Sequence, residues 1–172
     1  MYGINIFDKI KMPLDWAMVY HGIKKNILDT DIAQELACRK LEHNEQLSEE
    51  ELELSWNSNN RLDVLELIEK ILDSQGNVEE SIERAKDKIR IAIIIYLRET
   101  EKDKARLLER IDMIYADFDY PEDMDKLISY MPICDGSVPA SRTIEDNRNY
   151  LLSKLDNFIK EQQEKYRLEI KM

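Results

Sequence analysis

Glycine and proline are scarce in this chain, with four of each among 172 residues. Tight turns and β-hairpins depend on these two residue types, so their scarcity disfavours a turn-rich β architecture. Leucine, isoleucine, glutamate and lysine dominate instead, a composition that favours helices. The sequence therefore predicts an all-α fold, and its length corresponds to about one domain.

Apolar residues recur at helical spacing through the first third of the chain. Pro13 suits the first position of a helix, and Asp29 or Thr30 is the expected N-cap of the next helix. The apolar stripes of these two helices are predicted to contain Trp16, Val19, Tyr20, Ile23, Ile32, Leu36 and Leu41.

The stretch "LSEEEL" carries several signals for a helix start. Ser48 and Glu51 have the spacing of a capping box, and Leu47 and Leu52 flank the cap as a hydrophobic staple. A further helix is predicted from about Asn60 to Ser74, with Gly76 just past its end. Its predicted core residues are Leu62, Leu65, Ile68 and Leu72.

The most apolar run is "IRIAIIIYL", residues 89–97. Its β-branched residues would suit a buried strand. However, the polar stretch before it favours helices, and Asn77 with Glu80 repeats the capping pattern. We therefore expect one helix ending near Glu99 that forms the centre of the core. Because a membrane span needs about 20 apolar residues, this run does not predict one.

Three segments complete the predicted fold. An amphipathic helix covers "KARLLERIDMIYADF", with Leu107, Leu108, Ile111, Ile114 and Tyr115 facing inward, and "PEDMDKLISYM" continues as a helix with Pro121 near its first turn. A loop over 131–142 precedes a long C-terminal helix that begins near Thr143. The prediction is a single-domain bundle over 1–172, with seven or eight helices.

The net charge of −11 is unevenly distributed. Residues 142–172 hold seven bases and six acids, so residues 1–141 carry −12. An acidic surface repels nucleic acid and anionic lipid, and so we expect neither as a partner. Cys38 and Cys134 have no metal-ligand spacing. No signal peptide is evident, and we expect a cytoplasmic protein.

The stretch "YADFDYPEDMD", residues 115–125, places five carboxylates among three aromatic side chains without a base. An EF-hand loop starting at Asp117 would need glycine at its sixth position and glutamate at its twelfth. Those positions hold Glu122 and Ile128, so we predict no metal there. A tight joint between two helices explains Pro121 and the acids that follow it.

The joint does not explain every acid in this stretch. Asp117 and Asp119 lie near the carboxyl end of the preceding helix, where negative charge is unfavourable. Tyrosine beside carboxylate is typical of surfaces that bind lysine and arginine. The predicted partner-binding residues are Tyr115, Asp117, Asp119, Tyr120, Asp123 and Asp125, followed by the face of Glu49, Glu51 and Glu53.

Paired glutamates offer an enzymatic alternative. Glu50/Glu53 and Glu80/Glu83 have the E-x-x-E spacing with which all-α nucleotide pyrophosphohydrolases of the MazG and dimeric dUTPase type bind Mg²⁺. In so acidic a chain such pairs also arise by chance. His21 and His43 have no partner motif. We predict no catalytic residue, metal or cofactor.

The block "IYADFDYPEDMDKLISYMP", residues 114–132, resembles the signature of an uncharacterised family of small helical bacterial proteins. The stretch "LDWAMVYHGIKKNILDTDIAQELACRKL" is similar to that family's opening helices. Proteins of this kind resemble immunity proteins of contact-dependent growth-inhibition and polymorphic toxin systems. The resemblance implies that the partner is a cognate protein toxin, and it implies no catalytic residue. The acidic charge of the chain suggests that this toxin is basic. A helical adaptor subunit is a further alternative.

Overall fold

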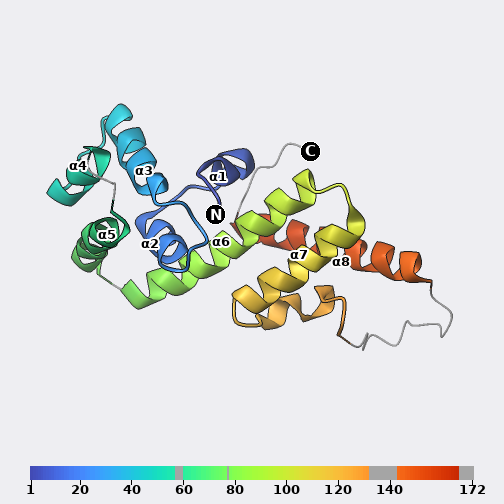
Figure 1. The fold of residues 1–172 in the computed structure, drawn as a ribbon. Coiled ribbons are helices and arrows are strands. Elements are labelled where there is room, and N and C mark those ends of the chain that lie inside the picture. The colour runs from blue at the N-terminus through green and yellow to red at the C-terminus, as the bar shows by residue number, and fades with distance from the viewer. Residues whose placement is uncertain (57–59, 77, 132–142, 167–172) are drawn as a thin grey trace. The chain divides into compact units, whose positions relative to one another are not determined.

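The computed structural model describes residues 1–56, 60–76, 78–131 and 143–166. Every regular element in these ranges is a helix (Figure 1), and extended pairing is limited there to an isolated bridge between Tyr2 and Leu28. The elements are α1 (Asn5–Ile10), α2 (Trp16–Lys24), α3 (Asp31–Glu42), α4 (Glu49–Trp56), α5 (Arg61–Gln75), α6 (Val78–Thr100), α7 (Lys104–Asp117), the 3-10 helix η1 (Glu122–Leu127) and α8 (Ile144–Tyr166). The all-α prediction is confirmed.

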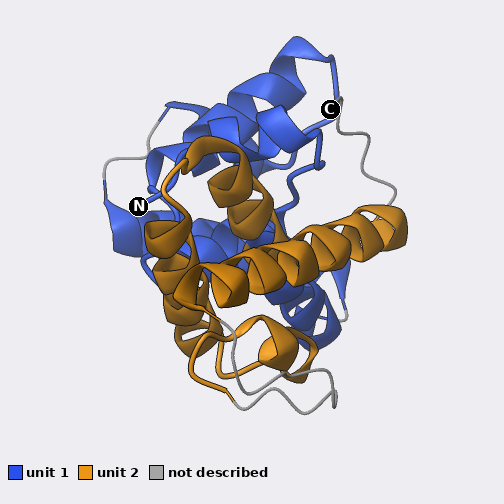
Figure 2. Ribbon diagram, turned by 90° about the vertical axis from the view of Figure 1, so that its right-hand side faces the viewer, with its two compact units in different colours: residues 1–89 blue, residues 90–172 orange. Residues whose placement is uncertain are grey.

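The chain divides into two compact units, residues 1–89 and residues 90–172 (Figure 2). The boundary falls inside α6, so the polar first half of that helix belongs to unit 1 and its isoleucine-rich second half to unit 2. One domain over 1–172 stays a prediction.

In unit 1, α2 is the most deeply buried helix, with every residue from Trp16 through Ile23 buried. It begins later than Pro13 predicted, because Asp15 is the N-cap and accepts a hydrogen bond from the Met18 amide (2.9 Å). At the other end of α2, the Arg61 guanidinium donates to the Ile23 and Lys24 carbonyl oxygens, each at 3.0 Å. The start of α5 is thereby fixed to the end of α2.

Gly22 allows the chain to fold back tightly after α2. A Cβ atom at this position would clash with Cγ and Cδ1 of the buried Leu28. The Gly22 carbonyl also accepts hydrogen bonds from the Ile27 and Leu28 amides, at 2.8 and 3.0 Å. Close approach of Leu28 to the helix backbone therefore depends on the missing side chain.

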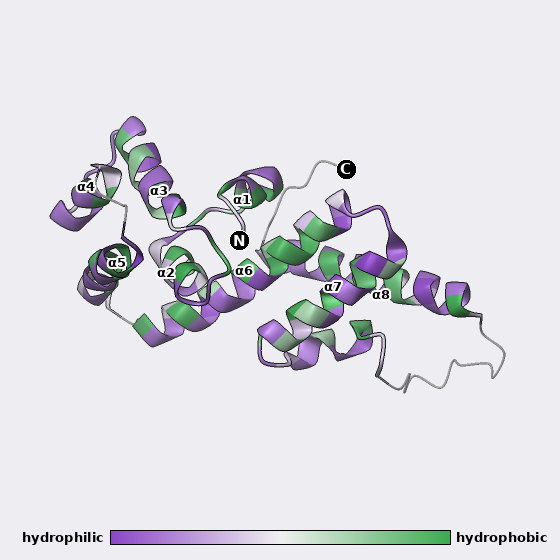
Figure 3. Ribbon diagram, in the orientation of Figure 1, coloured by the Kyte–Doolittle hydropathy of each residue, from purple (hydrophilic) through white to green (hydrophobic). Residues whose placement is uncertain are grey.

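In unit 2, the second half of α6 supplies much of the core. Apolar residues dominate this half of the helix, as Figure 3 shows. The helix prediction for 89–97 is confirmed, and the strand alternative is wrong. The five residues predicted to face inward on α7 are all buried. The predicted long C-terminal helix is present and begins at Ile144, and its apolar residues Leu151, Leu155, Phe158 and Ile159 are buried.

Some predictions of detail are wrong. Leu41 on α3 and Leu62 on α5 are exposed. Leu62 lies opposite the buried stripe of its helix, which consists of Val64, Leu67, Ile68, Ile71 and Leu72. Residues 121–131 form no α-helix, since η1 ends at Leu127 and Ile128 is extended again. The predicted Asn77 cap and nearly all of the 131–142 loop lie outside the described residues.

Candidate functional site

The acidic stretch of unit 2 forms a sharp bend that we call the α7–η1 corner (residues 112–125). The Asp119 amide donates to the Ala116 carbonyl (3.3 Å), and the Tyr120 amide donates to the Tyr115 carbonyl (2.9 Å). This pair of bonds is a Schellman motif, which normally places glycine at the left-handed position. Here Asp119 occupies that position with a φ of 63°.

Tyr120 adopts a left-handed conformation as well, with a φ of 56°. A bulky residue with positive φ is a genuine outlier and costs of order 1–3 kcal/mol. Its ring packs edge-on against Tyr115, with centroids 5.2 Å apart, yet Tyr120 remains 61% exposed. The corner therefore holds one aromatic ring outward in a fixed and strained position.

Two predicted binding residues support this bend from inside. Tyr115 is only 3% exposed, and its hydroxyl donates to Asp125 Oδ1 at 2.8 Å. This hydrogen bond, together with desolvation, raises the pKa of Tyr115 to about 12. Tyr115 and Asp125 therefore brace the corner and are not part of an open surface.

Asp123 also has an internal partner. Both of its carboxylate oxygens accept from the Arg90 guanidinium, at 2.5 and 2.9 Å. The Arg90 side chain is only 4% exposed, so this carboxylate neutralises a charge that lies almost fully inside unit 2. Asp112 is engaged too, since it accepts from the Ser129 amide (3.0 Å) and hydroxyl.

Three of the predicted binding residues, Asp117, Asp119 and Tyr120, are exposed on the outer side of the corner, together with Glu122. The sequence interpretation missed Met113 and Tyr130, which are also well exposed. Met113 lies off the buried stripe of α7, on the helix face that it shares with Asp117. Because Met113 does not fit the apolar spacing of α7, the sequence already contained a signal that Met113 is exposed.

The second predicted face lies on α4 in unit 1, where Glu51 is buried. Its carboxylate accepts from the Trp16 indole N–H (2.6 Å), the Ser48 amide (2.9 Å) and Lys40 Nζ. The Glu51 amide donates back to Ser48 Oγ (3.2 Å), which confirms the predicted capping box. Burial alone would raise the pKa of Glu51, but the hydrogen bonds outweigh it and lower the pKa.

Glu49 and Glu53 are exposed, and they share one side of α4 with Trp56. Trp56 was not predicted as a site residue, yet it is 73% exposed. On the neighbouring helix α5, Leu62 is 72% exposed. We call the set Glu49, Glu53, Trp56, Leu62 and Glu66 the α4–α5 face.

The two helices of this face are close in space as well as in sequence. α4 and α5 pack against each other within unit 1. Lys70 of α5 pairs with Glu66 at 2.9 Å. This hydrogen bond raises the pKa of Lys70, and the charges of Glu50 and Glu53 on α4 add to the effect. The acids of both helices therefore surround one lysine.

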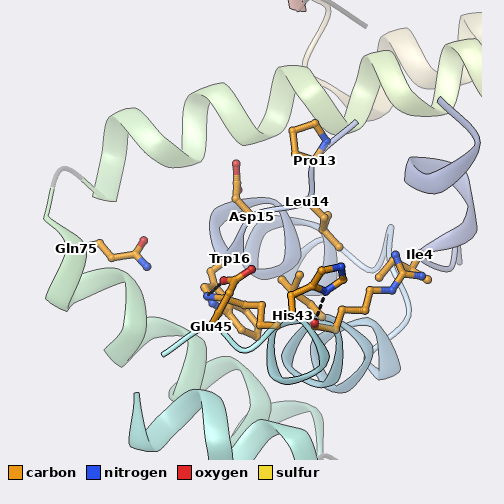
Figure 4. A pocket seen from close by; sticks show the side chains of 11 residues that line it. Ile4, Pro13, Leu14, Asp15, Trp16, His43, Glu45 and Gln75 are labelled. Atoms are coloured by element: carbon orange, nitrogen blue, oxygen red, sulfur yellow. Dashed lines mark hydrogen bonds and ion pairs between the residues drawn. The ribbon is translucent and has the colours of Figure 1, made fainter. Parts of the chain in front are cut away.

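Unit 1 also contains a cleft of about 660 Å³ between α2, α3 and the end of α5. Figure 4 shows Trp16 and His43 beside it, with Gln75 reaching in from α5. Its charged side chains already have partners within unit 1: Arg39 binds Asp8 at 2.5 and 2.8 Å, and Asp15 binds Lys88 at 2.9 Å. The cleft therefore offers no unmatched charge to select a ligand.

No group of three or more His, Cys, Asp or Glu side chains in the described ranges is arranged to hold a metal ion. The pairs Glu50/Glu53 and Glu80/Glu83 thus belong to no such group, and Glu80 forms an ion pair with Arg84. Across the same ranges, no helix combines the length and apolar character needed to cross a membrane.

No curated protein and no solved structure is significantly similar to the chain. One family model matches residues 4–163, nearly the whole length. The family is described as "Uncharacterized protein conserved in bacteria", which agrees with the bacterial family indicated by the sequence. The chain therefore belongs to this bacterial family, DUF2247.

Proposed function

We propose that this chain is an immunity protein that binds a cognate, basic bacterial toxin of the contact-dependent growth-inhibition kind and neutralises it. The α7–η1 corner is the binding surface, and binding requires no catalysis. The observation that carries the proposal is the exposed Tyr120 ring, held in a left-handed conformation beside the exposed Asp117 and Asp119.

Backbone strain of this kind is concentrated at functional sites, where the surrounding structure keeps a side chain in one position. The Schellman bonds and the Tyr115 ring provide that support here. A preorganised aromatic side chain loses little freedom on binding, so more of its contact energy contributes to affinity. Tyrosine is also among the residues enriched at binding hot spots.

The charge of the corner fits a basic partner. Residues 112–125 contain six acids and no base. Complementary charge accelerates association, toward about 10⁸–10⁹ M⁻¹s⁻¹ at low salt. Many toxins of this class act on nucleic acid and need basic substrate clefts, and an acidic protein that covers such a cleft blocks the substrate. The toxin reaches the cytoplasm of its target cell, so the inhibitor is expected there too.

A stable interface covers about 800 Å² on each partner, more than Tyr120 and two carboxylates provide. Met113 and Tyr130 supply further exposed apolar area in unit 2. Tyr130 lies near enough to Tyr115 to contribute to its raised pKa, which places it beside the corner. We therefore include Met113 and Tyr130 in the proposed interface.

The test uses the toxic domain encoded beside this chain. Co-expression of the two proteins should restore growth, and the purified pair should bind with an affinity that falls as salt rises. Tyr120→Ala should weaken binding by about tenfold or more. The double variant Asp117→Asn/Asp119→Asn should slow association markedly at low salt.

Glu161→Gln/Glu164→Gln is the matched control, because it removes two exposed charges from α8 of the same unit. This control should bind almost like the wild type. Unchanged binding by both corner variants would refute the assignment of the interface. Mg²⁺-dependent hydrolysis of nucleoside triphosphates that is lost in Glu50→Gln would instead support the enzymatic alternative.

A further inference from the structure

We propose that unit 1 carries a second protein-binding surface, the α4–α5 face, which accepts a cationic amphipathic segment of a partner protein. Such a segment presents apolar side chains to Trp56 and Leu62, and lysine or arginine side chains to the surrounding acids. This assignment rests on residues 48–56 and 60–76 alone and does not depend on a role for the α7–η1 corner.

The α4–α5 face exposes two large apolar side chains, Trp56 and Leu62. Trp56 ends α4 and Leu62 is the second residue of α5, and neither belongs to the buried stripe of its helix. Exposed apolar residues that occur singly need no explanation, but two large ones at one pair of packed helices indicate an interaction site. Tryptophan is the residue most enriched at binding hot spots.

Charge decides which partner fits. Residues 48–76 contain eight acids and two bases, a net charge of −6 out of −11 for the chain. Both bases are engaged within unit 1: Arg61 donates to carbonyl oxygens of α2, and Lys70 pairs with Glu66. Glu49 and Glu53 remain exposed on the same side of α4 as Trp56.

Other occupants fit this combination less well. A second copy of the chain would bring another net charge of −6 against the first, and like charges in contact cost several kcal/mol. Nucleic acid and anionic lipid surfaces are repelled for the same reason. A cationic segment gains attraction from the acids, and its guanidinium groups can also stack on the Trp56 ring.

Trp56 itself reports on binding. The chain has two tryptophans, and Trp16 is buried with its indole N–H bonded to Glu51. A shift in emission on ligand binding therefore arises from Trp56. The probe is a synthetic peptide of about 18 residues with leucine at helical i, i+3, i+4 and i+7 positions and lysine or arginine elsewhere. One control peptide scrambles the order, and another replaces each base with glutamate.

We expect the amphipathic peptide to shift the emission to shorter wavelength and to protect Trp56 from acrylamide quenching. Trp56→Ala and Leu62→Ala, measured by calorimetry, should each weaken binding about tenfold. Both side chains are exposed, so circular dichroism should show an unchanged fold. Equal binding of the scrambled peptide, or unaltered binding by Trp56→Ala, would overturn the proposal.

A pair of charge-matched variants separates a local site from general attraction. Glu49→Gln/Glu53→Gln and Asp117→Asn/Asp119→Asn each remove two negative charges, one pair from each unit. At about 50 mM salt, where charges are screened beyond about 14 Å, the first variant should weaken peptide binding several-fold and the second less than twofold. Equal weakening would refute a local site. A dimer that Trp56→Ala dissociates in sedimentation equilibrium would assign the face to a second copy.

Discussion

The α7–η1 corner and the helical pair α4–α5 carry the same net charge of −6, but they distribute it differently. In the corner, Asp112, Asp123 and Asp125 accept hydrogen bonds from within unit 2. In α4 and α5, most acids point to solvent. The same net negative charge in a sequence can therefore either support a fold or form a surface, depending on which donors lie near.

The two regions also differ in backbone. The corner holds its exposed ring on two consecutive left-handed residues, whereas Trp56 and Leu62 sit on regular helices. The corner thus contributes one fixed and strained shape, and the α4–α5 face contributes apolar area surrounded by charge. Substitutions that separate buried acids from exposed ones test this comparison most directly.

The largest effect is expected for Glu51→Ala. It leaves Lys40 and the Trp16 indole without their shared acceptor and removes the capping box, so the free energy of unfolding should fall by about 3 kcal/mol. Urea unfolding followed by tryptophan fluorescence measures this, because both tryptophans lie in unit 1. The exposed neighbour is the control: Glu53→Ala should change stability by less than about 0.5 kcal/mol. Equal losses would remove the distinction between the two acids.

Asp123→Ala should have the next largest effect, about 2 kcal/mol, because it deprives the buried Arg90 guanidinium of a bidentate partner. The cost stays below that of a fully buried pair, since the Asp123 carboxylate is partly exposed. Urea unfolding followed by far-UV circular dichroism measures it. Asp117→Ala, on the same corner, should have little effect. A loss under about 0.5 kcal/mol for Asp123→Ala would show that Arg90 does not depend on this acid.

Glu51 in unit 1 and Tyr115 in unit 2 should affect stability at opposite limits of pH. The pKa of Glu51 is lowered by its hydrogen bonds, and that of Asp8 is lowered chiefly by its hydrogen bond from Arg39. Their stabilisation is therefore present above the ordinary carboxyl pKa, about 4, and is lost as pH falls through the lowered values. The raised pKa of Tyr115 has the opposite sign: its stabilisation is present below about 10 and is lost as pH rises through about 12.

Unfolding free energies measured from pH 2 to pH 12 check both limits. Glu51→Gln should flatten the acid side of the profile, and Tyr115→Phe should flatten the alkaline side. At both acid and alkaline pH, the change in the free energy of unfolding should be smaller than the change caused by Glu51→Ala. A change in protonation leaves the packing of the side chains in place. An acid side that is unaltered in Glu51→Gln would contradict the assignment.

Glycine should have opposite effects on the two regions. Asp119→Gly relieves a left-handed residue and should raise the free energy of unfolding by about 1 kcal/mol. Position 53 is inside a regular helix, so Glu53→Gly should lower the free energy of unfolding by about 1 kcal/mol. Thermal unfolding of both variants measures the difference in sign. A destabilised Asp119→Gly would show that the aspartate side chain contributes more than its backbone conformation costs.

Signals between near neighbours in sequence predicted much of the fold. The capping box of Ser48 and Glu51, the inward residues of α7 and the C-terminal helix depend on spacings of three or four residues, and all are present. α1 was missed because six residues carry too little periodicity. Leu62 was misplaced because leucine alone does not say which side of a helix meets the core.

The candidate site was harder to predict, because its critical contacts join distant residues. Asp123 and Arg90 are 33 positions apart, and Glu51 and Trp16 are 35 apart. No local pattern shows which acids find such partners, so buried and exposed carboxylates were predicted together. Asp117, Asp119 and Tyr120, which were predicted to bind a partner, are exposed, whereas Trp56 could be placed on a surface only once the faces of α4 were known.

Gly22 limits how far a chain with this fold can vary. The backbone of α2 touches the Leu28 side chain where any side chain at position 22 would begin, so even alanine must displace Leu28. Exposed positions such as Glu53 tolerate most residues other than glycine and proline as far as folding is concerned. In a library that is randomised at every position and selected only for a folded product, position 22 would return chiefly glycine.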